Sequence, residues 1–383
     1  MSDGGGAPDV VVVGAGIVGC ATAWELARRG AAVTLVDRGE VSGGTTGLGE
    51  GNVLVSDKDA GPELELALLG RALYDELEDI GDGAARVRRK GALIVHPDAE
   101  TWALEPARAA RLRAAGVACE LVDGADVRAL EPNLTGPLHG ALRVGGDLQC
   151  DPRGLARALA REAEALGARV RTGADVARVQ GNGIVLHDGE RIDAGAVVLA
   201  AGPWSRSLAE DAGVALPLEP RKGQLTRLRL PQPDETWLRH KVVDGSYLSS
   251  VASAGTGVEV STVVETTADG HLIVGSSRER VGFDASVDDA LAERMVARAA
   301  RIVPGVSGLT RDATWVGFRP WLPDHLPAIG PASAAPGLWL ATGHEGAGVV
   351  LGPITGRLIA DALTGATPAL DLAPFSPDRF ATA

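Results

Sequence analysis

Three glycines and one aspartate near the N-terminus have the types and spacing of a dinucleotide site. Gly14, Gly16 and Gly19 form a G-x-G-x-x-G motif, and Asp37 ends the next apolar run of the chain. In such a motif the glycines permit a tight turn, close approach of the backbone to a pyrophosphate, and close packing of a helix on a strand. An acid at the position of Asp37 accepts hydrogen bonds from a ribose hydroxyl. The motif alone is compatible with either NAD or FAD.

The residues around the motif predict the β-α-β unit that would position it. The β-branched run in 9–13 predicts a strand, and the segment 20–29 predicts a helix that Gly30 ends. A second apolar run, 31–36, predicts the next strand. The N-terminus of the helix would present free N–H groups and a partial positive charge to phosphates. A glycine motif between a predicted strand and a predicted helix indicates dinucleotide binding much more specifically than the glycines alone.

Two further segments of small residues could lie against a bound cofactor. The loop 42–52 is rich in glycine and carries the hydroxyls of Thr45 and Thr46, so a flat ring system could rest against it; a plain surface connection is the alternative. Near the C-terminus, the glycine-rich turn 343–348 follows a predicted strand and opens a predicted helix, 349–363. That turn would offer a second set of N–H donors.

Composition excludes several classes of protein. The chain has 383 residues, which suits two domains, and a net charge of -13 argues against nucleic acid and against an anionic membrane surface as partners. Three widely spaced cysteines indicate neither a disulfide framework nor a zinc or iron–sulfur site, so we expect no metal. The N-terminus lacks a basic region and a long apolar run, so we expect a cytoplasmic protein with no signal peptide and no membrane span.

The middle of the chain predicts that two domains are interleaved. The segment 196–205 predicts a buried strand that ends in a glycine turn and returns to the nucleotide domain. The segment 216–281 is rich in strand-like runs and predicts an antiparallel sheet in a second domain. Asp151 followed by Pro152 predicts the N-cap and first residue of a helix between these parts.

Together these motifs resemble the glycine oxidase and D-amino-acid oxidase family of FAD-dependent amine oxidoreductases, over essentially the whole chain. The matching pieces are Gly14–Gly19, Thr45–Thr46, Asp151–Pro152, Val198–Ser205, Phe318–Pro320, Pro327–Gly330, Ala341–His344 and Pro353–Gly356. More narrowly, Gly49–Asn52, Val55–Lys58 and Thr342–Gly346 resemble the FAD subunits of heteromeric dehydrogenases of D-hydroxyproline, proline and opines.

The resemblance implies an α/β fold with a GR2-type, Rossmann-like FAD-binding domain and an interleaved substrate domain with a mixed or antiparallel sheet. The FAD-binding domain would comprise residues 1–85, 145–215 and 325–383, and the substrate domain 86–144 and 216–324. FAD would be noncovalent, because no cysteine lies near Trp315 or Gly343, where some relatives tether the flavin. Its binding residues would be Gly14, Gly16, Gly19, Asp37, Arg38, Thr45, Thr46, Gly51, Asn52, Val176, Gly202, Gly346, Gly348 and Val349.

The reaction that the resemblance implies removes a hydride from a carbon that bears an amine and delivers it to flavin N5. Arg319 stands where this family places the arginine that holds the substrate carboxylate; a surface or salt-bridged arginine is the alternative reading. Tyr247 would hydrogen-bond the substrate or pack in a core. His344 and Glu345 lie on the turn facing the flavin, where Glu345 would bind a substrate ammonium or remain a solvated loop acid. Simple glycine oxidases carry an arginine nearby, and this difference argues against glycine as the substrate.

The implied substrate is a D-amino acid or a cyclic secondary amino acid such as D-proline or D-hydroxyproline. Two alternatives stay open at this point. The chain could be an FAD-binding subunit whose turnover needs partner electron-transfer subunits, or a flavin oxidase of 2-hydroxy acids. The sequence does not separate an oxidase from a dehydrogenase, and we expect an oligomer.

Overall fold

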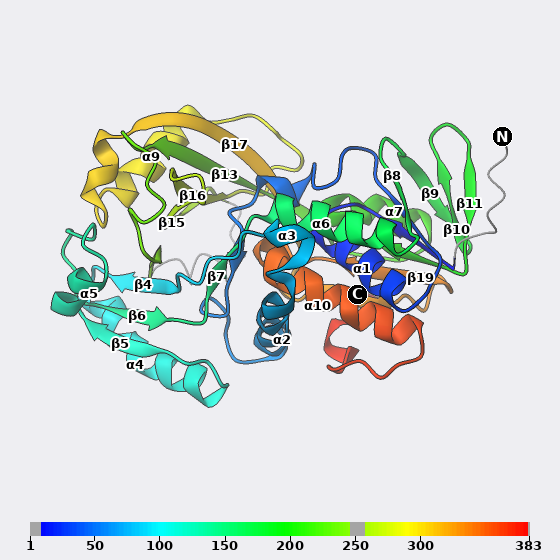
Figure 1. Ribbon diagram of the computed structural model, residues 1–383, viewed down its shortest axis with the longest axis horizontal. Coiled ribbons are helices and arrows are strands. Elements are labelled where there is room, and N and C mark those ends of the chain that lie inside the picture. The colour runs from blue at the N-terminus through cyan, green and yellow to red at the C-terminus, as the bar shows by residue number, and fades with distance from the viewer. Residues whose placement is uncertain (1–8, 246–256, 382–383) are drawn as a thin grey trace.

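The computed structural model of the protein describes residues 9–245 and 257–381. Two large sheets organise these residues, one at the right and one at the left of Figure 1. The first sheet takes its strands from 10–36, 169–199 and 328–342, and the second from 92–144 and 219–321. The chain therefore passes back and forth between the two sheets.

The first sheet has six strands. All neighbouring pairs are parallel except β18 and β19, at one edge of the sheet, which are antiparallel. In spatial order they are β18 (Ala328–Pro331), β19 (Leu338–Thr342), β12 (Ala196–Leu199), β1 (Val10–Val13), β2 (Val33–Val36) and β8 (Arg169–Arg171). Four consecutive valines suit β1 because both of its faces are buried. Val10 and Val12 point into one apolar cluster, and Val11 and Val13 into another.

Helices and a small sheet cover the two faces of the first sheet. The face of Val10 and Val12 lies against α1 (Ile17–Arg28), α6 (Pro152–Ala165) and α10 (Gly348–Leu363), with α2 (Pro62–Leu77) beyond α10. On the other face are α7 (Ser205–Asp211) and a three-stranded antiparallel sheet of β9 (Val176–Gln180), β10 (Gly183–Leu186) and β11 (Arg191–Asp193). The predicted start of α6 is confirmed, since Asp151 Oδ1 accepts hydrogen bonds from the N–H groups of Arg153 and Gly154.

The second sheet has eight strands and is antiparallel except where β14 runs parallel to β4. In spatial order they are β17 (Thr310–Trp321), β13 (Glu219–Arg229), β16 (Leu272–Arg278), β15 (Glu259–Thr266), β14 (Lys241–Asp244), β4 (Ala92–His96), β6 (Gly140–Val144) and β5 (Glu120–Asp123). One face packs on α9 (Asp289–Ala299) and α5 (Gly124–Leu130), while α4 (Ala99–Ala114) lies beside β4 to β6. The other face looks toward the first sheet.

Short elements join the two sheets where they meet. They are the 3-10 turns η1 (Thr45–Leu48), η2 (Gly202–Trp204) and η4 (Glu345–Ala347), the strand pair β3 (Asn52–Val53) and β7 (Leu148–Gln149), and α3 (Ile80–Gly83). The turns η3 (Pro304–Gly308), η5 (Ala373–Phe375) and η6 (Pro377–Phe380) lie elsewhere. In the described part of the chain, one segment is long and apolar enough to cross a membrane, namely Glu345–Leu363; more than half of it is buried, as in a core helix.

Candidate active site

The first glycine turn joins β1 to α1 at the carboxyl edge of the first sheet. Gly14 has a φ of 107°, and a Cβ atom there would lie 2.5 Å from the carbonyl oxygen of Ala200. A Cβ at Gly19 would lie only 1.8 Å from the carbonyl oxygen of Gly14. Side chains are therefore excluded at both positions, and the bare backbone stays open at the N-terminus of α1. Ligands of parallel α/β sheets bind at this edge.

Asp37 and Thr46 lie beside this turn. Asp37 directly follows β2, and its two carboxylate oxygens accept hydrogen bonds from the N–H groups of Ala15, at 2.6 Å, and Gly39, at 2.8 Å. Thr46 Oγ1 accepts a hydrogen bond of 3.0 Å from the N–H of Ile17, the first residue of α1. Both predicted residues thus converge on the glycine turn, and Thr46 ties the loop after β2 to the helix N-terminus.

The rest of that loop reaches the second sheet. Thr45 Oγ1 donates a hydrogen bond of 2.6 Å to the carbonyl oxygen of Phe318 on β17. Gly51 has a φ of 83°, and a Cβ there would lie 2.0 Å from the carbonyl oxygen of Cys150, so this crossing also needs glycine. Asn52 Nδ2 donates to Glu50 Oε2 at 2.6 Å.

Three other predicted cofactor residues lie around the same edge. Gly202 has a φ of 55°, and its carbonyl oxygen accepts a hydrogen bond of 2.9 Å from Thr342 Oγ1. The guanidinium of Arg38 lies 4.3 Å from the ring centroid of Trp204. Val176 begins β9 and is buried in the cluster beneath the sheet.

The second glycine turn, η4, opens α10 on the other side of the loop. The N-cap residue of α10, Ala347, provides no side-chain acceptor, so the first N–H groups of the helix, from Gly348 on, have no intrahelical acceptor; the N–H of Ala347 itself donates to the carbonyl oxygen of His344 at 2.9 Å. Val349 is held by a hydrogen bond of 2.7 Å that its carbonyl oxygen accepts from the hydroxyl of the buried Tyr74. The N-cap residues of both α1 and α10 thus provide no side-chain acceptor of their own, although Thr46 accepts the N–H of Ile17 at the start of α1.

Arg319 lies on β17 next to η4. Its Nη1 donates a hydrogen bond of 3.0 Å to the carbonyl oxygen of Ser277. A Cβ at Gly223, on the neighbouring strand β13, would lie 2.1 Å from that nitrogen, so the glycine makes room for the guanidinium. A Cβ at Gly346 would lie 3.8 Å from Arg319 Cδ. The predicted arginine and the predicted flavin turn are thus direct neighbours.

Glu345 is not a solvated loop acid. Its carboxylate forms an ion pair of 2.7 Å with Arg221 and a contact of 3.2 Å with His325 Nδ1. Burial alone would raise the pKa of Glu345, but His325, Arg221 and Arg278 lower it to about 2. Its backbone has a φ of 45°, which is uncommon for a residue other than glycine. Glu345 is therefore an ionised carboxylate held by an arginine of the second sheet.

His344 lies on the second glycine turn with its side chain directed to α10. Its side chain is buried, with Nε2 at 2.9 Å from Thr355 Oγ1 on α10. Burial lowers the pKa of His344 to about 3, so the ring is neutral at pH 7. The catalytic role predicted for His344 stays a prediction, and the structure shows its side chain packed against α10. Tyr247, the remaining predicted catalytic residue, lies outside the described residues.

Sequence patterns did not indicate the charged residues that surround Arg319. Arg221 pairs with Arg319 across β13 and β17 and is almost fully buried. Lys241 Nζ donates a hydrogen bond of 3.1 Å to Glu50 Oε2. Burial raises the pKa of Glu50, but Lys241, Asn52 and Arg319 together lower it below its ordinary value. Motifs could not find Arg221 and Lys241, because each is an isolated charge whose partner lies far away in the sequence.

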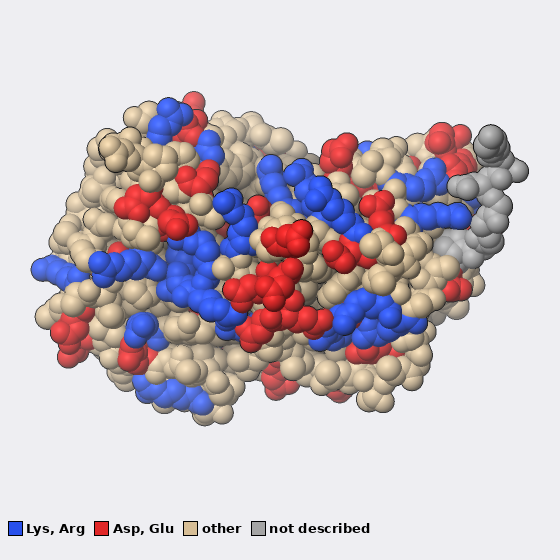
Figure 2. Space-filling model, viewed as in Figure 1, with Lys and Arg blue, Asp and Glu red and all other residues tan. Residues whose placement is uncertain are grey.

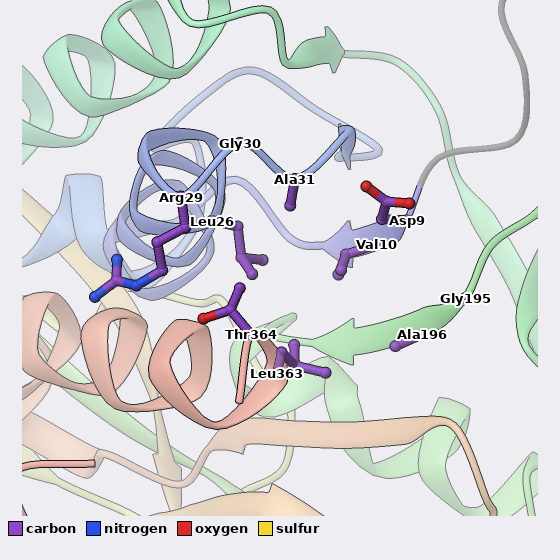
Figure 3. Close-up of a pocket in the computed structure, with 10 residues that line it drawn as sticks. All are labelled: Asp9, Val10, Leu26, Arg29, Gly30, Ala31, Gly195, Ala196, Leu363 and Thr364. Atoms are coloured by element: carbon purple, nitrogen blue, oxygen red, sulfur yellow. The ribbon is translucent and has the colours of Figure 1, made fainter. Parts of the chain in front are cut away.

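Two cavities open to the surface. One of about 400 Å³ lies between the end of α1, the residues after α10 and the starts of β1 and β12, near Asp9 and Thr364 (Figure 3). It lies at the amino edge of the first sheet, opposite the glycine turn. Another, of about 520 Å³, includes Glu50, Gln149 and Trp315 in its lining. Figure 2 shows basic and acidic side chains interspersed over one face of the molecule.

The residues present fit FAD. The glycine turn after β1 and the N-terminus of α10 can supply N–H donors, and neither N-cap residue has a side chain that would take them up. Asp37 lies at the end of β2 beside the first turn, and the loop 45–52 is hydrogen-bonded to the start of α1 through Thr46 and to β17 through Thr45. Within 9–245 and 257–381, no group of three or more His, Cys, Asp or Glu side chains is arranged to hold a metal ion.

Comparisons with known proteins agree with this reading. A family model described as "FAD dependent oxidoreductase" matches residues 9–362. Glycine oxidase of Pseudomonas aeruginosa is 32% identical over 395 residues, covering 96% of this chain and 98% of that protein. D-amino acid dehydrogenase of Cereibacter sphaeroides is 28% identical over 432 residues, covering 97% and 95%. The crystal structure of glycine oxidase from Geobacillus kaustophilus has a TM-score of 0.87 at 28% identity, covering 97% and 98%. The predicted family, α/β fold and FAD cofactor are thereby confirmed.

Proposed function

The chain belongs to the DAO family of FAD-dependent oxidoreductases, and on that premise we propose that it oxidises the carbon–nitrogen bond of a D-amino acid or a cyclic secondary amino acid. D-proline and D-hydroxyproline are the model substrates. When bound, FAD supplies a hydride acceptor at its N5 atom. The chain's own residues hold the substrate, exclude water and stabilise charge.

The observation that carries this proposal is the position of Arg319. Its guanidinium lies over Gly223, and its stem lies beside Gly346 at the start of the second glycine turn. A planar guanidinium can bind both oxygens of a carboxylate, which fixes the orientation of the α-carbon. Because η4 and α10 present N–H groups next to this site, the substrate carbon would be held against the flavin ring.

We propose that the remaining residues hold FAD as follows. Gly14, Gly16 and Gly19 would receive the pyrophosphate, Asp37 the adenosine ribose, and Val176 the adenine. Thr45, Thr46, Gly51 and Asn52 would line the flavin, while Gly346, Gly348 and Val349 would direct N–H groups to its pyrimidine end. Arg38 and Gly202 would complete the nucleotide side. Negative charge develops at the pyrimidine end on reduction, where a helix N-terminus is favourable.

We also propose the domain division stated above, with 1–85, 145–215 and 325–383 forming the FAD-binding domain and 86–144 and 216–324 the substrate domain. The protein would be cytoplasmic and oligomeric. FAD would be noncovalent, because Cys20 and Cys150 are buried and burial raises the pKa of each thiol. Acid precipitation should leave all the flavin in the supernatant; flavin that stays with the protein would contradict this.

The test is an anaerobic absorbance titration of the holoenzyme with D-proline, D-hydroxyproline, D-alanine, sarcosine and glycine. One of these should bleach the flavin band. The Arg319→Ala variant should lose about 100-fold in kcat/KM, roughly 3 kcal/mol, and Arg319→Lys should recover only part of it. The control is Arg311→Ala, because Arg311 pairs with Asp289 at the far end of β17. Unchanged kcat/KM in Arg319→Ala would reject the assignment.

A second candidate is an FAD-binding subunit that passes its electrons to a partner subunit. The D-amino acid dehydrogenase among the relatives favours it. After anaerobic bleaching, admission of air separates the two candidates: rapid recovery of the flavin band indicates an oxidase, and slow recovery indicates a partner acceptor. If only 2-hydroxy acids bleach the flavin band, both candidates are wrong and the protein is a flavin oxidase of 2-hydroxy acids.

A further inference from the structure

Three buried N–H donors near Arg319 have no hydrogen-bond partner. They are Nε and Nη2 of Arg280 and Nε1 of Trp321, and all three atoms are buried. Leaving a buried donor unpaired costs about 1–3 kcal/mol, and more for a charged group. Native proteins rarely keep such groups without a reason, so an acceptor that binds here is expected.

The three donors form one group. The guanidinium of Arg280 lies 3.7 Å from the ring centroid of Trp321, so the two side chains are stacked. Trp321 is 5% exposed and lies two residues after Arg319 on β17. Side chains two residues apart on a strand share a face, so the stacked pair lies on the same face as Arg319, roughly 7 Å further along the strand.

The same group borders the second glycine turn. The ring of His325 lies 5.8 Å from that of Trp321, and His325 Nδ1 lies 3.2 Å from Glu345 Oε2. Glu345 in turn binds Arg221, the cross-strand neighbour of Arg319. The unpaired donors therefore belong to the side of the sheet on which the substrate carboxylate would bind.

The positive charge of Arg280 favours the binding of an anion. Glu345 and Glu259 both bind Arg221, at 2.7 and 3.2 Å. No described carboxylate forms a hydrogen bond or ion pair with Arg280. The segment 246–256 contains no Asp or Glu in its sequence. A carboxylate would accept hydrogen bonds from the Arg280 guanidinium and from the Trp321 indole at once.

We propose that Arg280 and Trp321 form a second carboxylate subsite, so that the preferred substrates are amino acids with a second carboxylate beyond the α-carbon. This inference rests on the proposed function, in which Arg319 holds the first carboxylate. The spacing of roughly 7 Å along β17 suits two carboxylates separated by about three carbons. The substrate class is an amino or imino dicarboxylic acid.

The test measures binding without turnover, by isothermal titration of the holoenzyme. Glutarate, with two carboxylates, is compared with butyrate, which has one. The wild type should bind glutarate at least about 10-fold more tightly than butyrate. Arg280→Gln should remove this preference, and Trp321→Phe, which keeps an aromatic ring but loses the indole N–H, should reduce it several-fold. Arg311→Gln is the matched control and should change neither affinity.

Each outcome of this titration either supports or overturns the carboxylate subsite. Equal binding of the two acids by the wild type, no measurable binding of glutarate, or a preference that survives Arg280→Gln would overturn the subsite. Unchanged flavin absorbance and melting temperature show that each variant is folded. Failure of the proposed function would look different, because the flavin would then resist bleaching by every amino acid, whatever the calorimetric preference.

Discussion

Replacing Glu345 by Gln tests the ion pair that links η4 to the second sheet. The carboxylate lies 2.7 Å from Arg221, whose side chain is only 2% exposed. The pKa of Glu345 falls from an ordinary value of 4.5 to about 2. At about 1.36 kcal/mol per pKa unit, this difference of about 2.5 units corresponds to roughly 3 kcal/mol of stability at pH 7. Loss of one partner of a buried pair costs a similar amount.

The sign of the pH dependence follows from the direction of the shift. A carboxylate whose pKa is lower in the folded state stabilises the fold fully above its unfolded pKa, and this stabilisation is lost as the pH falls through the folded pKa. For Glu345 the window runs from about 4.5 down to about 2. The difference in unfolding free energy between the wild type and Glu345→Gln should therefore be largest at pH 7 and less than half as large at pH 3.

Urea unfolding of both proteins, with the same excess of FAD, measures this difference. Glu190→Gln is the control, because Glu190 pairs with Arg171 on the surface, where the two side chains are 45% and 38% exposed. Such exposed pairs contribute less than about 1 kcal/mol. The reasoning is refuted if Glu345→Gln destabilises no more than Glu190→Gln, or if its effect is the same at pH 3 and pH 7.

Two further substitutions probe the cofactor turn and α10. Gly19→Ala should abolish FAD binding or folding, because its Cβ would lie 1.8 Å from the carbonyl oxygen of Gly14; a purified variant that keeps a full complement of flavin would contradict this. His344→Gln, which can keep the hydrogen bond to Thr355, should leave the pH profile of flavin reduction between pH 5 and 9 unchanged, because burial lowers the pKa of His344 to about 3. A shifted profile would restore a catalytic role for this histidine.

The sequence predicted well the features that depend on contacts between residues close together in the chain. Gly14 and Gly19 mark the first turn because a Cβ atom at either position would collide with a backbone oxygen. Asp151 and Pro152 likewise predict the start of α6, because Asp151 accepts hydrogen bonds from N–H groups in the first turn of that helix. The family resemblance extended these local signals to the position of Arg319 beside η4.

What could not be predicted depends on contacts between distant parts of the chain. Arg221 and Glu345 stand 124 positions apart, and only the packing of β13 against η4 brings them together. His344 belongs to the second glycine-rich turn, and its side chain is hydrogen-bonded to Thr355, 11 positions further along the chain. No local sequence pattern could predict the parallel pairing of β14 with β4, because it joins residues near 242 to residues near 93.

The order of strands in the first sheet has a consequence for how the protein is made. β1 pairs with β12, Val10 opposite Ala196, and β12 pairs with β19, Val197 opposite Leu338. A ribosome must therefore synthesise nearly the whole chain before the cofactor sheet can close, and pairings so distant in sequence form slowly. Until then one edge of β1 and one edge of β12 stay open to pairing with other chains, and the complete cofactor site can form only after translation is almost finished.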